Sequence, residues 1–209
     1  MNYIPLCLFV ILSAANIRTR EMGLNKESGV IKLTLAPMAL LYVLLNTNFD
    51  QTTKIIIIVA YCLYLIGDAF LLSSKTILFG IGLMSFLLGH ICFIVFFIAN
   101  HQSYKFVPFA LIAMIYPLYQ MFKITKPAGK LKLAMRMYSI LMVLFITTST
   151  MMSNPIFTIG ASIFTLSDSF IARNSYSDKK HFDDFYIMGT YTLALILLST
   201  GLIIYSTGL

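Results

Sequence analysis

The chain has 209 residues, of which 59% are hydrophobic and only 11% are charged, and its mean hydropathy is +0.87. A soluble domain of this size does not need so much apolar surface, so the composition excludes an ordinary globular domain and indicates a membrane protein. The formal net charge of +7 does not indicate a nucleic-acid partner, because the basic residues lie mainly in loops between apolar runs.

Long apolar runs predict an all-α fold, a polytopic transmembrane helical bundle that forms a single domain over residues 1–209. The eight expected spans are 3–16, 30–47, 54–73, 78–98, 106–122, 133–151, 155–172 and 184–207. The first span is short, but no Lys or Arg precedes it, so it lacks the basic segment of a signal peptide.

The basic residues fall almost entirely into alternate loops. If the spans alternate in direction, one face receives thirteen of the fifteen Lys and Arg residues, and the other face receives Lys54 and Lys105. The thirteen are Arg18, Arg20, Lys26, Lys32, Lys75, Lys123, Lys126, Lys130, Lys132, Arg136, Arg173, Lys179 and Lys180. Because cytoplasmic loops are enriched in Lys and Arg, we expect both termini on the non-cytoplasmic side.

Two aspartates lie within apolar runs, Asp68 in YLIGDAFLL and Asp168 in TLSDSFIA. An ionisable side chain inside a membrane is costly unless it has a partner or faces a cavity, so each marks a candidate functional site. At 1.5 Å per residue, Asp68 lies about 21 Å along its helix from Lys54, and Asp168 lies about 20 Å from Pro155. We therefore expect the two carboxyl groups at the same depth, in one site.

Further polar residues accompany the aspartates. Tyr61, Tyr64 and Asp68 follow i, i+3, i+7 spacing and so predict a polar stripe on one helix face. The polar candidates on other spans are His90, Ser167 and Tyr191. Each of these residues also has a purely structural interpretation, as a hydrogen-bond anchor or as part of the core.

Neither a metal nor another cofactor is expected. Within the predicted spans His90 is the one histidine, and Cys7, Cys62 and Cys92 are scattered without CxxC spacing. A zinc site of three or four protein ligands is therefore poorly supplied, and no disulfide framework is implied.

Five segments carry a recognisable family pattern. They are APMALLYVLL (36–45), GDAFLL (67–72), LLGHICFIVFF (87–97), GASIFTLSDSFIARN (160–174) and FYIMGTYTLAL (185–195). In this order and spacing they resemble the YhhN-type lysoplasmalogenase family of eight-span membrane proteins. The chain departs from the pattern at Ala36, where the family commonly has Lys before Pro, and at Leu195; Lys32, one turn before Ala36, is a candidate substitute.

The resemblance implies hydrolysis of the vinyl-ether bond of a lysoplasmalogen to a fatty aldehyde and glycerophosphoethanolamine or glycerophosphocholine. It implies that Asp68 and Asp168 are the essential catalytic pair. Because two close carboxyl groups can share a proton and so supply an acid and a base together, we expect one of them to be the general acid and the other to activate water. Tyr64 and Lys32 join the supporting or substrate-binding candidates. The expected partners are a lysophospholipid substrate and membrane lipid, in a bacterial inner membrane or alternatively an organelle membrane.

Two other functions compete with hydrolysis. A proton-coupled transporter or channel would use the same aspartates as a proton relay. A lipid-binding or receptor-like helical bundle is the third alternative.

Overall fold

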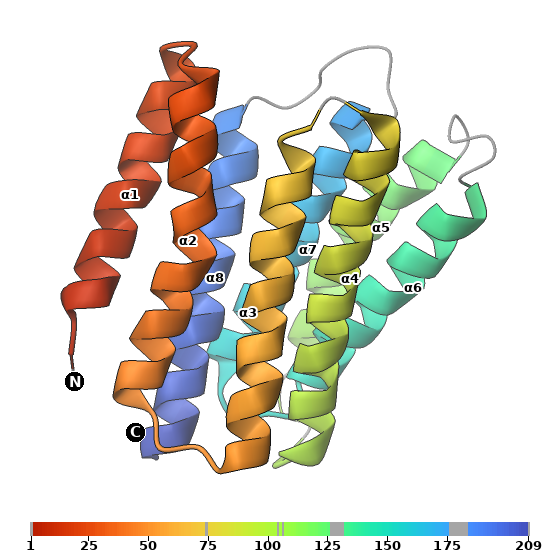
Figure 1. The fold of residues 1–209 in the computed structure, drawn as a ribbon. Coiled ribbons are helices and arrows are strands. Elements are labelled where there is room, and N and C mark those ends of the chain that lie inside the picture. Colours follow the sequence, from red (N-terminus) through yellow and green to blue (C-terminus); the bar gives the residue numbers. More distant parts are fainter. Residues whose placement is uncertain are drawn as a thin grey trace. The chain divides into compact units, whose positions relative to one another are not determined.

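The computed structural model describes residues 2–73, 75–103, 105, 107–125, 132–175 and 184–208. These residues form eight α-helices and no strand, which confirms the predicted all-α class (Figure 1). The helices are α1 (Ile4–Glu21), α2 (Asn25–Asn46), α3 (Gln51–Leu71), α4 (Thr76–Ala99), α5 (Val107–Thr125), α6 (Lys132–Ser149), α7 (Pro155–Ser175) and α8 (Asp184–Thr207). Each overlaps one predicted span, in the same order.

Among the described residues, five helices are long and apolar enough to cross a membrane: α2, α3, α4, α7 and α8. Helices α5 and α6 contain shorter apolar stretches, Val107–Tyr116 and Met137–Ser149. These helices indicate a multi-pass membrane protein. The complete set of eight spans and the side of the termini stay predictions. Lys126, Lys130, Lys179 and Lys180, which the predicted topology places in cytoplasmic loops, lie outside the described residues.

The chain forms two compact units. Unit 1 consists of Met1–Phe96 with Leu198–Leu209, and unit 2 consists of Phe97–Leu197. The expected single domain stays a prediction.

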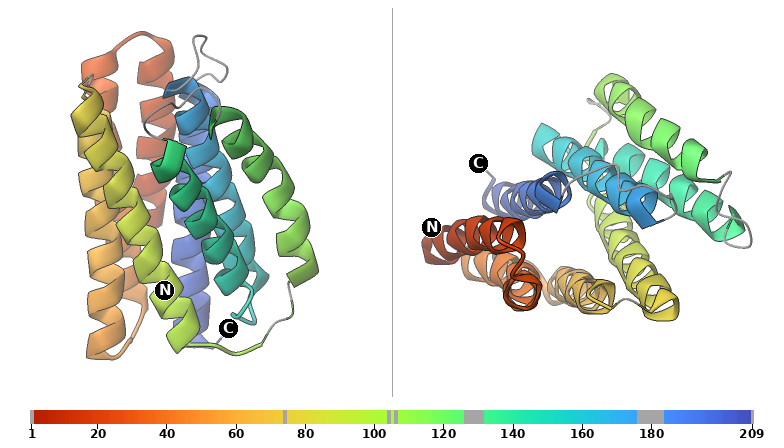
Figure 2. Two further views of the ribbon diagram at one scale, coloured as in Figure 1. Left: turned by 90° about the vertical axis from the view of Figure 1, so that its right-hand side faces the viewer. Right: turned by 90° about the horizontal axis from the view of Figure 1, so that it is seen from above.

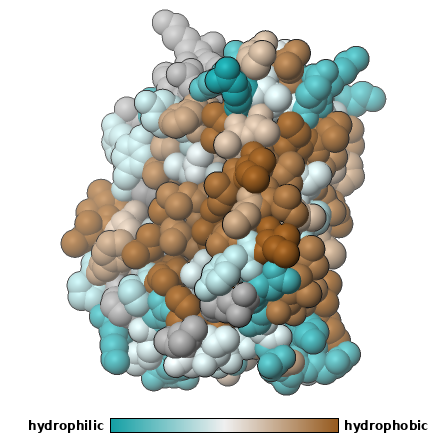
Figure 3. All heavy atoms as spheres, turned by 90° about the vertical axis from the view of Figure 1, so that its left-hand side faces the viewer, coloured by the Kyte–Doolittle hydropathy of each residue, from teal (hydrophilic) through white to brown (hydrophobic). Residues whose placement is uncertain are grey.

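Unit 1 begins with an antiparallel pair of helices, α1 and α2. The turn between them contains Gly23 with a φ of 76°, a conformation that glycine adopts without strain. The buried Asn16 side chain holds the pair together by donating a 2.6 Å hydrogen bond to the Ser28 carbonyl. Ile4 and Ile11 of α1 are exposed, and hydrophobic side chains gather in a broad band on the face shown in Figure 3. Such a surface suits contact with lipid tails.

The two chain ends of unit 1 lie at one end of its helices (Figure 1). The backbone N–H of Asn2 donates to the Asn46 side chain at 2.6 Å, and that of Asn48 donates to Ser206 at 3.1 Å. These contacts join both ends of the chain to the turn between α2 and α3.

Helix α3 starts at a side-chain cap. Asp50 is the N-cap residue, and its carboxylate accepts a hydrogen bond from the Thr53 backbone at 3.1 Å. Hydrogen bonds from the Thr53 side chain and backbone hold the pKa of this carboxyl group below its usual range. The cap therefore fixes the beginning of the helix that carries Asp68.

Helices α3 and α4 approach closely at glycines. A Cβ atom at Gly82 would lie 3.1 Å from the Gly67 carbonyl oxygen, and one at Gly89 would lie 2.5 Å from a ring carbon of Tyr64. The Ser85 hydroxyl donates a 2.6 Å hydrogen bond across the contact to the Leu63 carbonyl. Small residues allow two membrane helices to approach in this way. As a result, the side of α3 that carries Tyr64 lies directly against α4.

In unit 2, helices α5, α6 and α7 pack against one another (Figure 2). Aromatic contacts fill one end of this unit, where Phe97 meets Phe157 edge-on at 5.2 Å and stacks on Phe145 at 6.1 Å. Near the same end, the backbone N–H groups of Gln102 and Ser103 donate to the Met151 carbonyl at 2.8 and 2.9 Å. This packing fixes α7, which carries Asp168, against α6.

Candidate functional site

Asp68 lies on the buried face of α3. Tyr61, Tyr64 and Asp68 are 1%, 0% and 0% exposed, so the predicted stripe is confirmed as one buried helix face. The i, i+3, i+7 spacing places the three side chains in a row because a helix turns once every 3.6 residues. The Tyr61 hydroxyl pairs with Ser199 at 2.6 Å within unit 1. The stripe thus combines a structural hydrogen bond at one end with a buried carboxyl group at the other.

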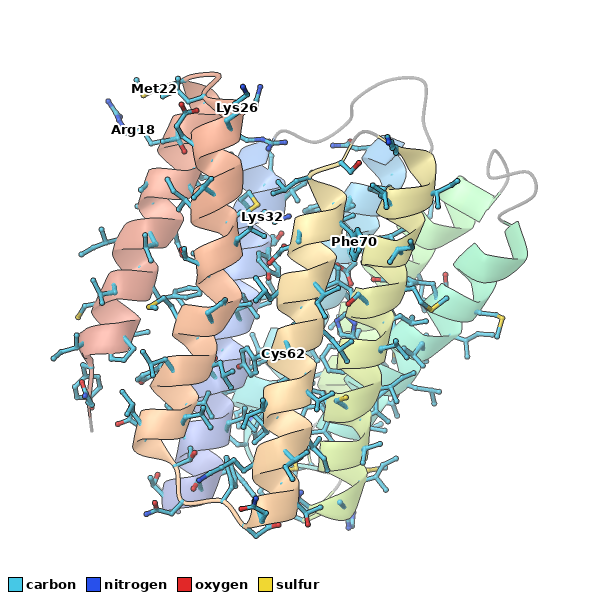
Figure 4. The ribbon with its side chains drawn as sticks, viewed as in Figure 1. Arg18, Met22, Lys26, Lys32, Cys62 and Phe70 are labelled. Carbon is cyan, nitrogen blue, oxygen red and sulfur yellow. The ribbon has the colours of Figure 1, made fainter. Side chains whose placement is uncertain are left out.

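The Asp68 carboxylate forms an ion pair with Lys32. The Lys32 Nζ atom lies 3.0 Å from Asp68 Oδ1, and the two side chains are 13% and 0% exposed. Figure 4 shows Lys32 further along α2 than Lys26, which lies near the turn between α1 and α2. The neighbouring helices α2 and α3 therefore bring together two of the residues that the sequence singled out.

Tyr64 and His90 meet where α3 contacts α4. Their ring centroids are 5.5 Å apart and tilted by 57°, and the Tyr64 ring also stacks on Phe86 at 5.8 Å and Phe93 at 6.1 Å. Both residues are fully buried. The absence of a side chain at Gly89 provides the space that the Tyr64 ring occupies. This aromatic cluster holds His90 against Tyr64, which lies one turn before Asp68 on α3.

In unit 2, Asp168 is 3% exposed on α7 and accepts a hydrogen bond from the Tyr138 hydroxyl of α6. Tyr138 is absent from the residues that the sequence singled out, because one tyrosine in an apolar span looks like a core residue. Tyr138 can be identified by comparing how far each residue lies along its helix. Tyr138 lies about 9 Å from the start of α6 and Asp168 about 10 Å from the end of α7, on antiparallel neighbours.

The remaining predicted residues also lie in unit 2. Ser167 donates a 3.1 Å hydrogen bond to the Ile187 carbonyl and so ties α7 to α8. Tyr191 is 2% exposed and meets Phe164 edge-on at 5.7 Å. Both contacts hold α8 against the helix that carries Asp168. The catalytic support predicted for Ser167 and Tyr191 stays a prediction.

A family comparison identifies the kind of protein to which these residues belong. The model of the YhhN family matches residues 28–202. The chain belongs to the YhhN family. No curated protein and no solved structure matches the chain significantly. The matched range contains every predicted site residue as well as Tyr138.

This YhhN protein thus holds two buried carboxyl groups, each with a hydrogen-bond donor from a neighbouring helix. Asp68 has the Lys32 ammonium in unit 1, and Asp168 has the Tyr138 hydroxyl in unit 2. Their meeting in one site stays a prediction. Within the described part of the chain, no three His, Cys, Asp or Glu side chains are grouped so as to hold a metal ion.

Proposed function

We propose that this YhhN protein is a lysoplasmalogenase-like hydrolase. It cleaves the vinyl-ether bond of a lysoplasmalogen to a fatty aldehyde and glycerophosphoethanolamine or glycerophosphocholine. Membership of the YhhN family over residues 28–202 carries the proposal. The two buried aspartates support it, because a membrane helix keeps such costly residues mainly at functional sites.

Two carboxyl groups suit the chemistry of this reaction. A vinyl ether is cleaved by transfer of a proton to its alkene carbon, which leaves an oxocarbenium ion that water attacks. The resulting hemiacetal collapses to the aldehyde and the alcohol. One carboxylic acid supplies the proton, and one carboxylate stabilises the cation and takes a proton from water. In the proposed mechanism Asp68 and Asp168 form this pair.

The substrate is proposed to lie within the membrane among the helices. The alkyl chain requires an apolar path, which the apolar side chains of the helices would provide. We propose the inner membrane of a bacterial cell as the location, with lipid of that bilayer as the source of substrate.

The test is aldehyde release by detergent-purified protein from a lysoplasmalogen. The intact diradyl plasmalogen and a lysophospholipid ester serve as substrate controls. Asp68→Asn and Asp168→Asn should each lower turnover by about 100-fold or more, the usual contribution of a general acid or base. Asp50→Asn is the matched control, because Asp50 is an exposed aspartate that asparagine replaces well at a helix N-cap.

Two results would contradict the proposal. Near-normal turnover in either aspartate variant would exclude the two-carboxyl mechanism. No aldehyde from folded wild-type protein would exclude the hydrolase, and proton-driven uptake into liposomes would then identify a transporter.

A further inference from the structure

The ion pair between Lys32 and Asp68 is costly for the protein to keep. It joins a fully buried carboxylate to an ammonium that is 13% exposed. Buried ion pairs contribute little net stability, because the loss of hydration offsets most of the attraction between the charges. Apolar residues would fill the same space between α2 and α3 at no such cost. The pair is therefore better explained by what it does to Asp68 than by stability.

The Lys32 ammonium lies directly against the Asp68 carboxyl group. At 3.0 Å from Oδ1, a lysine cation attracts a carboxylate far more strongly than a neutral carboxylic acid. The contact therefore favours the carboxylate form of Asp68, which accepts hydrogen bonds and can take up a proton. A group in this state is poorly suited to deliver the first proton of vinyl-ether cleavage and well suited to face a cation.

We infer, on the basis of the proposed hydrolase function, that Lys32 is a positioning residue that keeps Asp68 in the carboxylate form, so that Asp68 is the base of the reaction. After a carboxylic acid has transferred its proton to the alkene carbon, the Asp68 carboxylate takes one proton from the water that attacks the oxocarbenium ion. When the hemiacetal collapses, Asp68 gives that proton to the departing alcohol oxygen, and the acid regains a proton from the hydroxyl group. Both groups thereby return to their starting states.

A double-mutant cycle tests this inference. Aldehyde release is measured for wild type, Lys32→Met, Asp68→Asn and the double variant, with Lys32→Arg as the conservative replacement. Lys32→Met should lower kcat by about tenfold or more with little change in KM, and Lys32→Arg should retain most of the activity. In the Asp68→Asn background, Lys32→Met should add almost no further loss, because Lys32 acts through Asp68. Lys54→Met, at the other end of α3, is the matched control.

The outcomes separate this inference from the function on which it rests. Losses that multiply in the double variant, or a Lys32→Met effect confined to KM, would overturn the inference and indicate that Lys32 acts directly on the substrate. If the wild-type protein released no aldehyde, both the hydrolase function and this inference would be contradicted.

Infrared spectroscopy supplies a measurement that is independent of turnover. In an Asp168→Asn background, Lys32→Met should produce a protonated-carboxyl band that Asp68→Asn removes; its absence would contradict the role assigned to Lys32.

Discussion

Replacing Gly89 with alanine tests the contact between α3 and α4 that positions Tyr64 and His90. The added Cβ atom would lie 2.5 and 2.8 Å from two ring carbons of Tyr64 and 3.2 Å from the Ala60 carbonyl oxygen. The Tyr64 ring is stacked on Phe86 and Phe93, so it has little room to move. The two helices must therefore separate or the aromatic cluster must rearrange.

Gly80 on the same helix provides the matched control. A Cβ atom there meets nothing within 4 Å. Both substitutions gain the preference of a helix for alanine over glycine, which is about 1 kcal/mol. This gain cancels when the two variants are compared, and overpacking at Gly89 remains, at a cost of about 1–3 kcal/mol. We expect Gly89→Ala to be less stable than Gly80→Ala by that amount.

Unfolding of the purified protein in mixed detergent micelles measures this difference, with aldehyde release as a second readout. Gly80→Ala should unfold at or above the wild-type midpoint and keep its activity. Gly89→Ala should unfold earlier and lose activity, because the displaced rings lie beside His90. Equal stability of the two variants would refute the close approach of α3 and α4.

Three other substitutions test individual contacts. Tyr138→Phe removes the hydrogen bond to the Asp168 carboxyl group, and a bond to an ionisable group of this kind is worth about 1.5–3 kcal/mol. Turnover should therefore fall by about ten- to 100-fold, whereas Tyr119→Phe, at an exposed tyrosine, should leave it unchanged. Equal turnover in the two variants would count against a role for Tyr138. Tyr61→Phe leaves its serine partner unpaired and should cost about 1 kcal/mol of stability in detergent unfolding, with turnover of the folded protein close to wild type. Asp50→Ala should lower the melting temperature at pH 7. Since the pKa of Asp50 is lowered in the folded state, this difference should be complete above the usual aspartate range and disappear as the pH falls through the lowered value; a difference that persists in acid would contradict the capping role.

Hydropathy predicted the helices but not where α1 ends and α2 begins. The first predicted span ends at residue 16, whereas α1 continues to Glu21, and the second begins at 30, whereas α2 begins at Asn25. Hydropathy reports where side chains prefer lipid, whereas a helix continues as long as its backbone hydrogen bonds do. Helix α1 therefore continues through polar residues such as Arg18 and ends just before the turn at Gly23. The boundaries therefore differ where the helices carry charge.

Sequence analysis identified the site residues whose burial in lipid costs much free energy, and it missed a residue whose burial costs little. Asp68 and Asp168 stand out because carboxyl groups are rare within apolar runs. Lys32 drew attention only as a neighbour of Ala36, where the chain departs from the family pattern. Tyr138 gave no such signal, because an aromatic residue in a membrane helix is ordinary and its hydroxyl group gains meaning only from the helix opposite.

The partners of the two aspartates explain why their roles could not be assigned from the sequence. A carboxyl group has no fixed role of its own, since the same side chain can be an acid or a base in different surroundings. What distinguishes Asp68 is an ammonium supplied by α2, and what Asp168 holds is a phenol supplied by α6. Both contacts depend on how far one helix is shifted and rotated against the next. Because those shifts come from glycine contacts, hydrogen bonds and aromatic packing along whole helices, the chemistry of each carboxyl group is a property of the packed helices and not of the aspartate itself.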